Sequence, residues 1–251
     1  MILKNFNFKK DNDIQFVLGF SGDADTKIPK VPEDDPLQKD YKRIQEERVT
    51  RIIRDCLLKF KDLNGKIAIL TGGTKGGVPE WATKISKEMG FKTIGIYPLV
   101  GKKYFLGNQY VDFSFCVEPI YQDADTKHLF SIDSCWGDES SLFAKLLDSV
   151  IVIGGAAGTL IEVAYILKLN KEIMKGKTRY PRLKYIVPIS GFGGVSEGIY
   201  TIWSSPEVAD KSILSYTFTP DKQRSSGRLY SGTQAADVLF NTEELNLWDL
   251  Y

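Results

Sequence analysis

Five short apolar runs rich in β-branched residues recur along this chain, and they constrain its fold more than any other feature. They are Ile14–Gly19, Lys66–Gly73, Phe91–Pro98, Ser149–Gly155 and Leu183–Gly191, with Phe113–Pro119 as a weaker sixth. Their apolar character is nearly continuous rather than alternating. This pattern is typical of strands that are covered on both faces, as in a parallel sheet.

Helical patterns lie between these runs. Residues 49–60 keep the spacing of one buried stripe, and shorter stripes occupy 81–89, 142–147 and 160–169. Strands and helices that alternate in this way predict an α/β fold with a doubly wound, mostly parallel sheet, which is Rossmann-like and has three layers, α/β/α. No Pro/Gly/Ser-rich linker divides the 251 residues, so we expect a single domain.

Three segments fall outside this alternation. Residues 24–36 read as a polar loop, and residues 101–132 read as an irregular insertion that carries several tyrosines. Residues 204–251 read as an irregular C-terminal extension with a short helix near 233–240 and an apolar end, LNLWDLY.

Charge and cysteine content exclude several classes of protein. The chain has 33 basic and 32 acidic residues, whereas duplex nucleic acid or an anionic membrane normally requires a basic face. Three widely spaced cysteines and one histidine, His128, predict neither a metal site nor a disulfide framework. No signal peptide is recognisable at the N-terminus, so a cytoplasmic location is expected.

Residues 150–167 form an apolar run long enough to suggest a membrane span. Glu162 and the sequence Gly-Gly-Ala-Ala-Gly interrupt that run, so we interpret it as a strand, a tight loop and a helix inside one domain.

Glycine and small hydroxyl residues follow three of the predicted strands. Glycine allows backbone N–H groups to approach a phosphate closely, and the next helix offers its positive N-terminal end. Parallel strands end at one edge of the sheet, so the three turns together predict a site for a phosphate-bearing ligand. The candidate ligand-binding residues are Gly19, Ser21 and Gly22 in LGFSGDAD; Gly72, Gly73, Thr74, Lys75 and Gly76 in LTGGTKGGVPE; and Gly154, Gly155, Ala157, Gly158 and Thr159 in IGGAAGTLIE. No GxxxxGK[ST] or GxGxxG fingerprint is present.

These motifs resemble a known family. LTGGTKGGVPEWATKISKEMGFKTIGIYP and IGGAAGTLIEVAYILK are similar to the two glycine segments of the Lonely Guy phosphoribohydrolases, members of the SLOG group of Rossmann-like nucleotide binders. That group also includes molybdenum cofactor carriers and nucleotide-sensing domains. The resemblance covers residues 14–191 and implies that Gly155, Gly158 and Thr159 bind phosphate and that Glu162 is catalytic. It also implies that Gly19 and Ser21 lie in the loop after the first strand.

The chain also departs from the family pattern. Gly154 replaces the family's proline, and Ala156 replaces its second glycine. At the start of the preceding helix, Glu139 and Ser140 stand where the family has an Arg-Lys pair. These departures bear on the phosphoribohydrolase activity rather than on the fold.

Glu162 has two interpretations. Its spacing from Thr159 matches a capping box, T-x-x-E. Alternatively, it is a carboxyl beside a ribose, where it stabilises an oxocarbenium-like centre or activates water while burial raises its pKa. Asp138 and Glu139 are candidate partners across the sugar, or simply helix N-terminal charges. Trp136 and the tyrosines of 101–132 are candidates for stacking a base, although core packing is the commoner role.

Three functions remain compatible with the sequence. They are cleavage of an N-glycosidic bond in a nucleotide or ribosyl phosphate, non-catalytic binding of a nucleotide signal such as an ADP-ribose-like ligand, and carriage of molybdenum cofactor. No cofactor is expected for the hydrolase. The family resemblance also implies a homodimer or higher homo-oligomer.

Overall fold

Six parallel strands form the central sheet in this computed structural model, which describes residues 8–23, 32–178, 180–202, 212–214, 216–218 and 224–250. In spatial order the strands are β4 (Phe113–Val117), β3 (Lys92–Pro98), β2 (Ile67–Thr71), β1 (Phe16–Gly22), β7 (Ser149–Ile153) and β8 (Tyr185–Ile189). The chain builds outward from β1 to β4 and then returns to place β7 on the other side of β1. The order therefore reverses between β1 and β7, and this is the position where open α/β sheets bind ligands.

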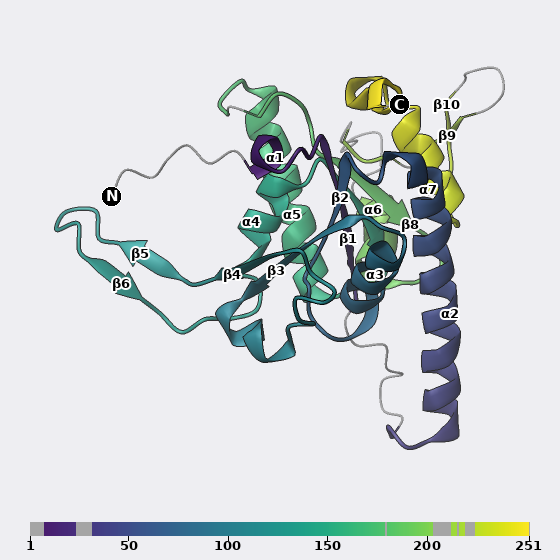
Figure 1. Ribbon diagram of the computed structural model, residues 1–251, viewed down its shortest axis with the longest axis horizontal. Coiled ribbons are helices and arrows are strands. Elements are labelled where there is room, and N and C mark those ends of the chain that lie inside the picture. Colours follow the sequence, from purple (N-terminus) through teal and green to yellow (C-terminus); the bar gives the residue numbers. More distant parts are fainter. Residues whose placement is uncertain are drawn as a thin grey trace.

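Helices cover both faces of the sheet (Figure 1), which confirms the predicted three-layer fold. One face packs against α2 (Pro36–Lys59), α3 (Gly77–Glu88) and α7 (Gly232–Phe240). The other packs against α1 (Phe8–Asp11), α4 (Ser140–Leu146), α5 (Ala157–Met174) and α6 (Gly194–Ile202). Because both faces are covered, β2, β7 and β8 are buried along their whole length, which explains their continuous apolar sequences.

Strand β1 differs from its prediction in a way that matters for the site. It runs from Phe16 to Gly22, so Gly19 and Ser21 lie within the strand and not in the loop after it. Phe16, Leu18 and Phe20 face α2 and α3, whereas Val17 faces α4 and α5. Side chains alternate along a strand, so Ser21 points to the α4 and α5 side.

Helix α2 begins much earlier than its buried stripe indicated. Asp35 caps its N-terminus by accepting a hydrogen bond from the amide of Leu37, and Pro36 occupies the first turn. Of the loop expected at residues 24–36, positions 24–31 lie outside the described residues, 32–35 are irregular and Pro36 starts the helix.

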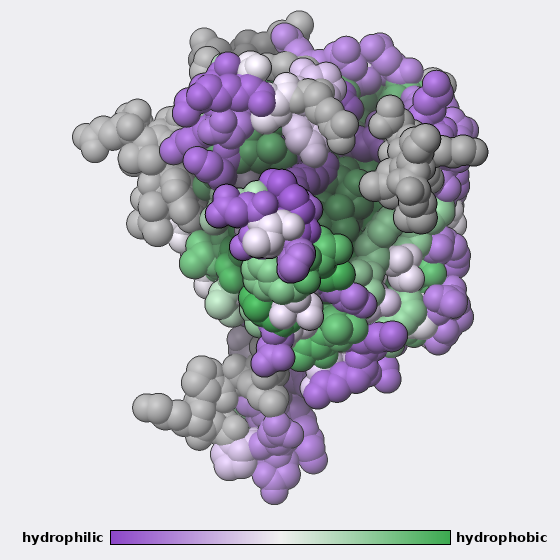
Figure 2. Space-filling model, turned by 90° about the vertical axis from the view of Figure 1, so that its left-hand side faces the viewer, coloured by the Kyte–Doolittle hydropathy of each residue, from purple (hydrophilic) through white to green (hydrophobic). Residues whose placement is uncertain are grey.

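The segment expected to be an irregular insertion holds several elements. A 3₁₀ stretch (Leu99–Tyr104) leads to β4, and β5 (Ile120–Gln122) pairs with β6 (Leu129–Ser131) in a hairpin that projects from the body (Figure 1). On that side of the molecule hydrophobic surface gathers around the hairpin (Figure 2). The hairpin exposes large apolar side chains on both strands; Leu129, for example, is 71% exposed.

The end of the chain packs on α7. Leu247 is fully buried, and the ring of Trp248 lies 4.9 Å from that of Phe240. The C-terminal extension also contains the short pair β9 (Tyr216–Phe218) and β10 (Arg224–Ser226), and 3₁₀ turns follow α7. A further 3₁₀ turn, Lys61–Leu63, follows α2.

Residues 150–167 form β7, a tight loop and the start of α5, as predicted. No helix in the described part of the chain is long and apolar enough to cross a bilayer.

Candidate functional site

The loop between β7 and α5 presents several backbone amides for which the described part of the chain offers no acceptor. Helix α5 has Ala156 at its N-cap, and no side chain caps it. Among the hydrogen bonds between described residues, none is donated by the amides of residues 155–159. Ala156, Ala157 and Gly158 are exposed. Free N–H groups at the positive end of a helix that is open to solvent form a site suited to an anion such as phosphate.

Two glycines give the loop its shape. Gly154 and Gly155 have φ values of 65° and 102°, which side chains rarely adopt. A Cβ on Gly155 would also lie 2.6 Å from Cβ of Thr159. The loop therefore requires glycine at position 155 for two separate reasons.

Glu162 lies in the second turn of the same helix. Its carboxyl accepts a hydrogen bond from the hydroxyl of Ser21 in β1. It follows Gly158 by four residues, so both lie on one helix face, and helical side chains lean toward the N-terminus. A Cβ at Gly158 would meet no atom within 4 Å. Open space therefore lies next to Glu162, on the side of the free amides.

The capping-box interpretation of Glu162 is wrong. Thr159 is the third helical residue and not the N-cap, and the bond that Glu162 accepts comes from another element.

Burial raises the pKa of Glu162 to about 8. The hydrogen bond from Ser21 acts in the opposite direction, and the negative charge of Glu139 adds to the rise. The carboxyl is therefore largely protonated at neutral pH and can donate a proton. A partly buried acid with a perturbed pKa at a sheet edge is a recognised indicator of a functional site.

Glu139 and Asp138 precede α4 but have different surroundings. Glu139 is half-buried, accepts a bond of 2.8 Å from the amide of Gly137, and interacts electrostatically with Glu162. Burial, with a contribution from Asp138, raises its pKa. Asp138 instead accepts bonds from the amide and the thiol of Cys135, at 2.9 and 3.3 Å. Glu139 thus acts electrostatically on Glu162, whereas Asp138 is bonded within its own turn.

The end of β1 completes this side of the site. A Cβ on Gly22 would lie 2.3 Å from the carbonyl oxygen of Ile153 and 2.6 Å from Val78. Gly22 therefore allows β1, β7 and the start of α3 to meet closely. Gly19 lies away from the edge, where a Cβ would contact Leu147 and Phe143. We interpret Gly19 as a packing residue.

The second glycine loop reaches the same edge, but its amides are largely occupied. The amide of Gly73 donates to Thr71, that of Lys75 to the carbonyl of Tyr104, and that of Gly76 to the carboxylate of Glu80. Gly72 and Gly77 flank these positions, Thr74 is buried, and Lys75 is exposed. Of this loop, Lys75 remains the candidate for contact with a ligand.

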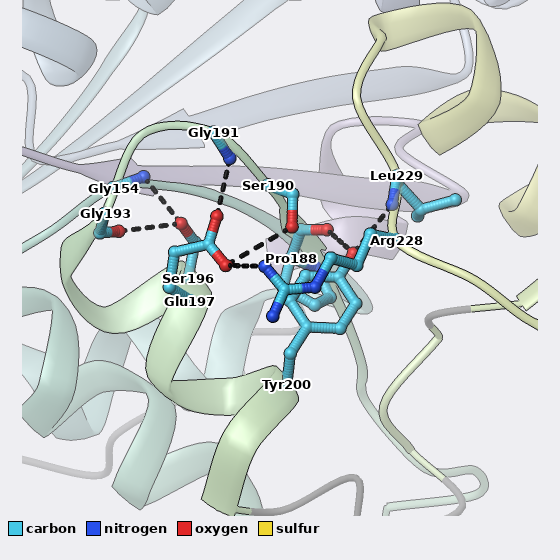
Figure 3. Close-up of polar contacts among 10 residues, drawn as sticks. All are labelled: Gly154, Pro188, Ser190, Gly191, Gly193, Ser196, Glu197, Tyr200, Arg228 and Leu229. Atoms are coloured by element: carbon cyan, nitrogen blue, oxygen red, sulfur yellow. Dashed lines mark hydrogen bonds and ion pairs between the residues drawn. The ribbon is translucent and has the colours of Figure 1, made fainter.

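A fourth glycine turn follows β8 and was missed in the sequence. Gly191, Gly193 and Gly194 all have positive φ. Ser196, in the first turn of α6, bonds to Gly154 (Figure 3). The sequence did contain a signal for this turn. The glycine-rich stretch SGFGG comes at the end of the last predicted strand, just as the other three glycine turns come at the ends of their strands.

The aromatic and histidine candidates lie mainly in the hairpin region. Trp136 is 52% exposed and packs near Tyr104, with ring centroids 6.1 Å apart. Tyr121 stacks on Phe130 within the hairpin, and His128 is exposed at the same hairpin. Of these, Trp136 lies nearest to α5, since a Cβ on its neighbour Gly137 would lie 3.1 Å from Ile161 of that helix. No cluster of three or more metal-ligating side chains is found among the described residues.

Fold and site together define a Rossmann-like α/β protein in which an exposed helix N-terminus without a side-chain cap lies at the switch point of the sheet. The solved structures that are similar to it include two that match over nearly the whole chain. A structural-genomics target named TM1055 is 16% identical, with 90% of this chain and 99% of that chain covered and a TM-score of 0.52. The molybdenum cofactor binding protein from the phototrophic bacterium Rippkaea orientalis is 16% identical, with 91% and 97% covered and a TM-score of 0.51.

The sequence itself matches no family model and no curated protein. At 16% identity the two structural similarities concern the fold. They agree with the Rossmann-like fold expected from the resemblance to Lonely Guy and SLOG proteins.

Proposed function

We propose that this protein binds a nucleotide or related ribosyl phosphate and cleaves its N-glycosidic bond. One observation carries the proposal: Glu162 lies one helical turn beyond the free amides of residues 155–159, with open space at Gly158 between them. A phosphate on those amides would place the attached ribose beside the Glu162 carboxyl.

The two acids suit complementary roles. Glu162, with its pKa raised to about 8, donates a proton to the departing base or to a ribose oxygen. Glu139 acts as the second carboxyl, which stabilises positive charge on the sugar or removes a proton from water. The bond between C1′ and the base nitrogen breaks, water oxygen bonds to C1′, and the base leaves with a proton. Asp138 has no role in this scheme, because its carboxylate is held by Cys135.

Base release from purified protein tests this proposal. The substrates are AMP, NAD and ADP-ribose, and the variants are Glu162→Gln and, as a matched control on the same helix, Glu172→Gln, whose surface side chain pairs with Lys168 and Lys175. We expect release by wild type and by Glu172→Gln, and a loss of about 100-fold or more in Glu162→Gln. Equal rates in the two variants would contradict a catalytic role for Glu162.

A binding function without turnover is the second candidate. Glu139 and Ser140 occupy the positions of the Arg-Lys pair of the resembling family, so the cationic part of that site is absent from α4. Tight binding of ADP-ribose by wild type without base release would favour a nucleotide sensor. The fold is also shared with a molybdenum cofactor binding protein. Binding of that cofactor in the same assay, without nucleotide binding, would favour a carrier.

We also propose that the protein acts in the cytoplasm as a homodimer or higher homo-oligomer. The exposed apolar side chains of the hairpin, among them Ile120, Leu129 and Phe130, support an interface. Leu247 is already buried within the chain, so the C-terminal end contributes less than its sequence indicated. Light scattering coupled to size exclusion measures the state, and Leu129→Asp should shift it toward monomer.

A further inference from the structure

The first turn of α6 donates backbone hydrogen bonds to the β7–α5 loop. The amides of Val195 and Ser196 donate to the carbonyl oxygens of Gly155 and Gly154, at 2.9 and 3.0 Å. The hydroxyl of Ser196 accepts a bond of 3.1 Å from the amide of Gly154 and donates one of 3.1 Å to the carbonyl of Gly193 (Figure 3). Ser196 is fully buried and does not itself face solvent.

These bonds determine where the free amides of the loop point. In a trans peptide the C=O and the following N–H lie in one plane and point in opposite directions. The carbonyls of Gly154 and Gly155 point to α6, so the N–H groups of Gly155 and Ala156 point away from it. The exposed surface of Ala156, Ala157 and Gly158 marks the open part of this loop. The contacts with α6 thus aim the amides at the place where an anion would bind.

The two segments approach so closely that only glycine fits between them. A Cβ on Gly194 would lie 2.3 Å from the carbonyl oxygen of Gly155. At the neighbouring Gly193, which has a similar positive φ, a Cβ would meet nothing within 4 Å. The pair therefore offers a matched comparison, because both substitutions strain the backbone but only one pushes on the loop.

Further contacts fix the start of α6 itself (Figure 3). Glu197 accepts a bond of 2.5 Å from the amide of Gly191 and forms an ion pair with Arg228. The hydroxyl of Tyr200 donates to the carbonyl of Pro188, at 2.6 Å, and accepts from the amide of Leu229, at 2.9 Å. The C-terminal segment and β8 thus both hold α6 in place behind the loop.

We propose that Ser196 is a positioning residue for the anion-binding loop, and that the first turn of α6 sets the direction of the loop amides. The inference rests on the proposed function only in requiring that the loop bind phosphate. It does not require that the glycosidic bond be cleaved. The Glu197–Arg228 pair supports the same arrangement one residue further along the helix.

The test compares a ligand that has a phosphate with one that lacks it. Affinities for AMP and adenosine are measured by calorimetry for wild type, Ser196→Ala, Gly194→Ala and Gly193→Ala. We expect Ser196→Ala to weaken AMP binding about 3- to 10-fold, as the loss of the hydrogen bond between its hydroxyl and the Gly154 amide implies, and to leave adenosine binding unchanged. Gly194→Ala should weaken AMP binding at least as much, whereas Gly193→Ala should not alter the ratio of the two affinities.

Several results would overturn the proposal. A general structural role would weaken AMP and adenosine binding equally in Ser196→Ala. Equal affinity of wild type for the two ligands would show that the loop does not hold phosphate. If Gly194→Ala fails to fold, Ser196→Ala decides the question alone. Base release is scored separately, so phosphate-dependent binding without turnover would refute the proposed hydrolase and still support this role of α6.

Discussion

The hydroxyl of Ser21 donates a hydrogen bond to the carboxyl of Glu162, and this bond joins β1 to α5 across the switch point of the sheet. The two residues are 141 positions apart in the chain. The contact orients the acid toward the sheet edge rather than into bulk solvent. It is also the interaction that opposes the effect of burial on the pKa of Glu162.

Ser21→Ala should therefore raise the pKa of Glu162 above its wild-type value of about 8. The hydrogen bond favours the charged form of Glu162 and so lowers its pKa. Without it, only burial and the charge of Glu139 act on the carboxyl, and both raise the pKa. Carbon-detected NMR titration of Glu162 measures the pKa. Ser190→Ala is the matched control, since Ser190 directly follows β8 and its hydroxyl points to Glu197 instead. A pKa of Glu162 that is unchanged or lower in Ser21→Ala would contradict the interpretation of this bond.

Glu162 should make the protein less stable as the pH rises from about 5 to about 8. Its pKa is near 4.5 in a solvated chain and about 8 in the folded protein. Below the lower value both states hold the proton, and the stabilising contribution is complete. Between the two values only the folded state holds it, so the free energy of unfolding falls by up to about 1.4 kcal/mol per pH unit.

Urea unfolding of wild type and Glu162→Gln at pH 5, 6, 7 and 8 measures this effect. The glutamine does not titrate, so the variant should gain stability relative to wild type as the pH rises. Carboxyl groups that do not interact with Glu162 contribute equally to both proteins and cancel in the difference. Parallel curves across this range would mean that Glu162 keeps an ordinary pKa in the folded state.

Gly155→Ala and Gly158→Ala should have opposite effects on stability although both weaken phosphate binding. At position 155 an alanine combines a φ of 102° with a 2.6 Å approach to Thr159, which costs about 1–3 kcal/mol. At position 158 the first helical turn accepts alanine in open space, which stabilises by about 0.5–1 kcal/mol. The new methyl group at 158 then stands beside the free amides. Thermal unfolding and AMP titration of both variants test these expectations. A melting temperature of Gly158→Ala below that of wild type would contradict them.

The sheet was predictable because its strands are buried on both faces and their apolar runs are continuous. The first half of α2 was not, because the apolar side chains of residues 36–48 are exposed; Leu37 is 60% exposed and Ile44 45%. A helix without a buried face leaves no stripe in the sequence. The Asp35–Pro36 pair at its start was the available signal.

The candidate site was predictable in part. Glycine turns at three strand ends located the edge, but Gly19 was misread as a turn because a glycine inside a strand looks the same in sequence. Phe143 and Leu147 occupy the space that a side chain at Gly19 would need. The pairing of Ser21 with Glu162 depends on strand order, which periodicity does not reveal. The same holds for the contacts between Ser196 and Gly154.

Glu139→Gln and Asp138→Asn should separate the two acids that precede α4. Glu139 interacts electrostatically with Glu162 and raises its pKa, so Glu139→Gln should lower the pKa of Glu162 and reduce base release about 10- to 100-fold. The Asp138 carboxylate accepts bonds from Cys135, so Asp138→Asn should reduce stability by about 1 kcal/mol and change base release little. Urea unfolding and base release are measured on both proteins. If Asp138→Asn instead lost activity at full stability, the second carboxyl of the site would have to be Asp138, and the turn would have to rearrange when ligand binds.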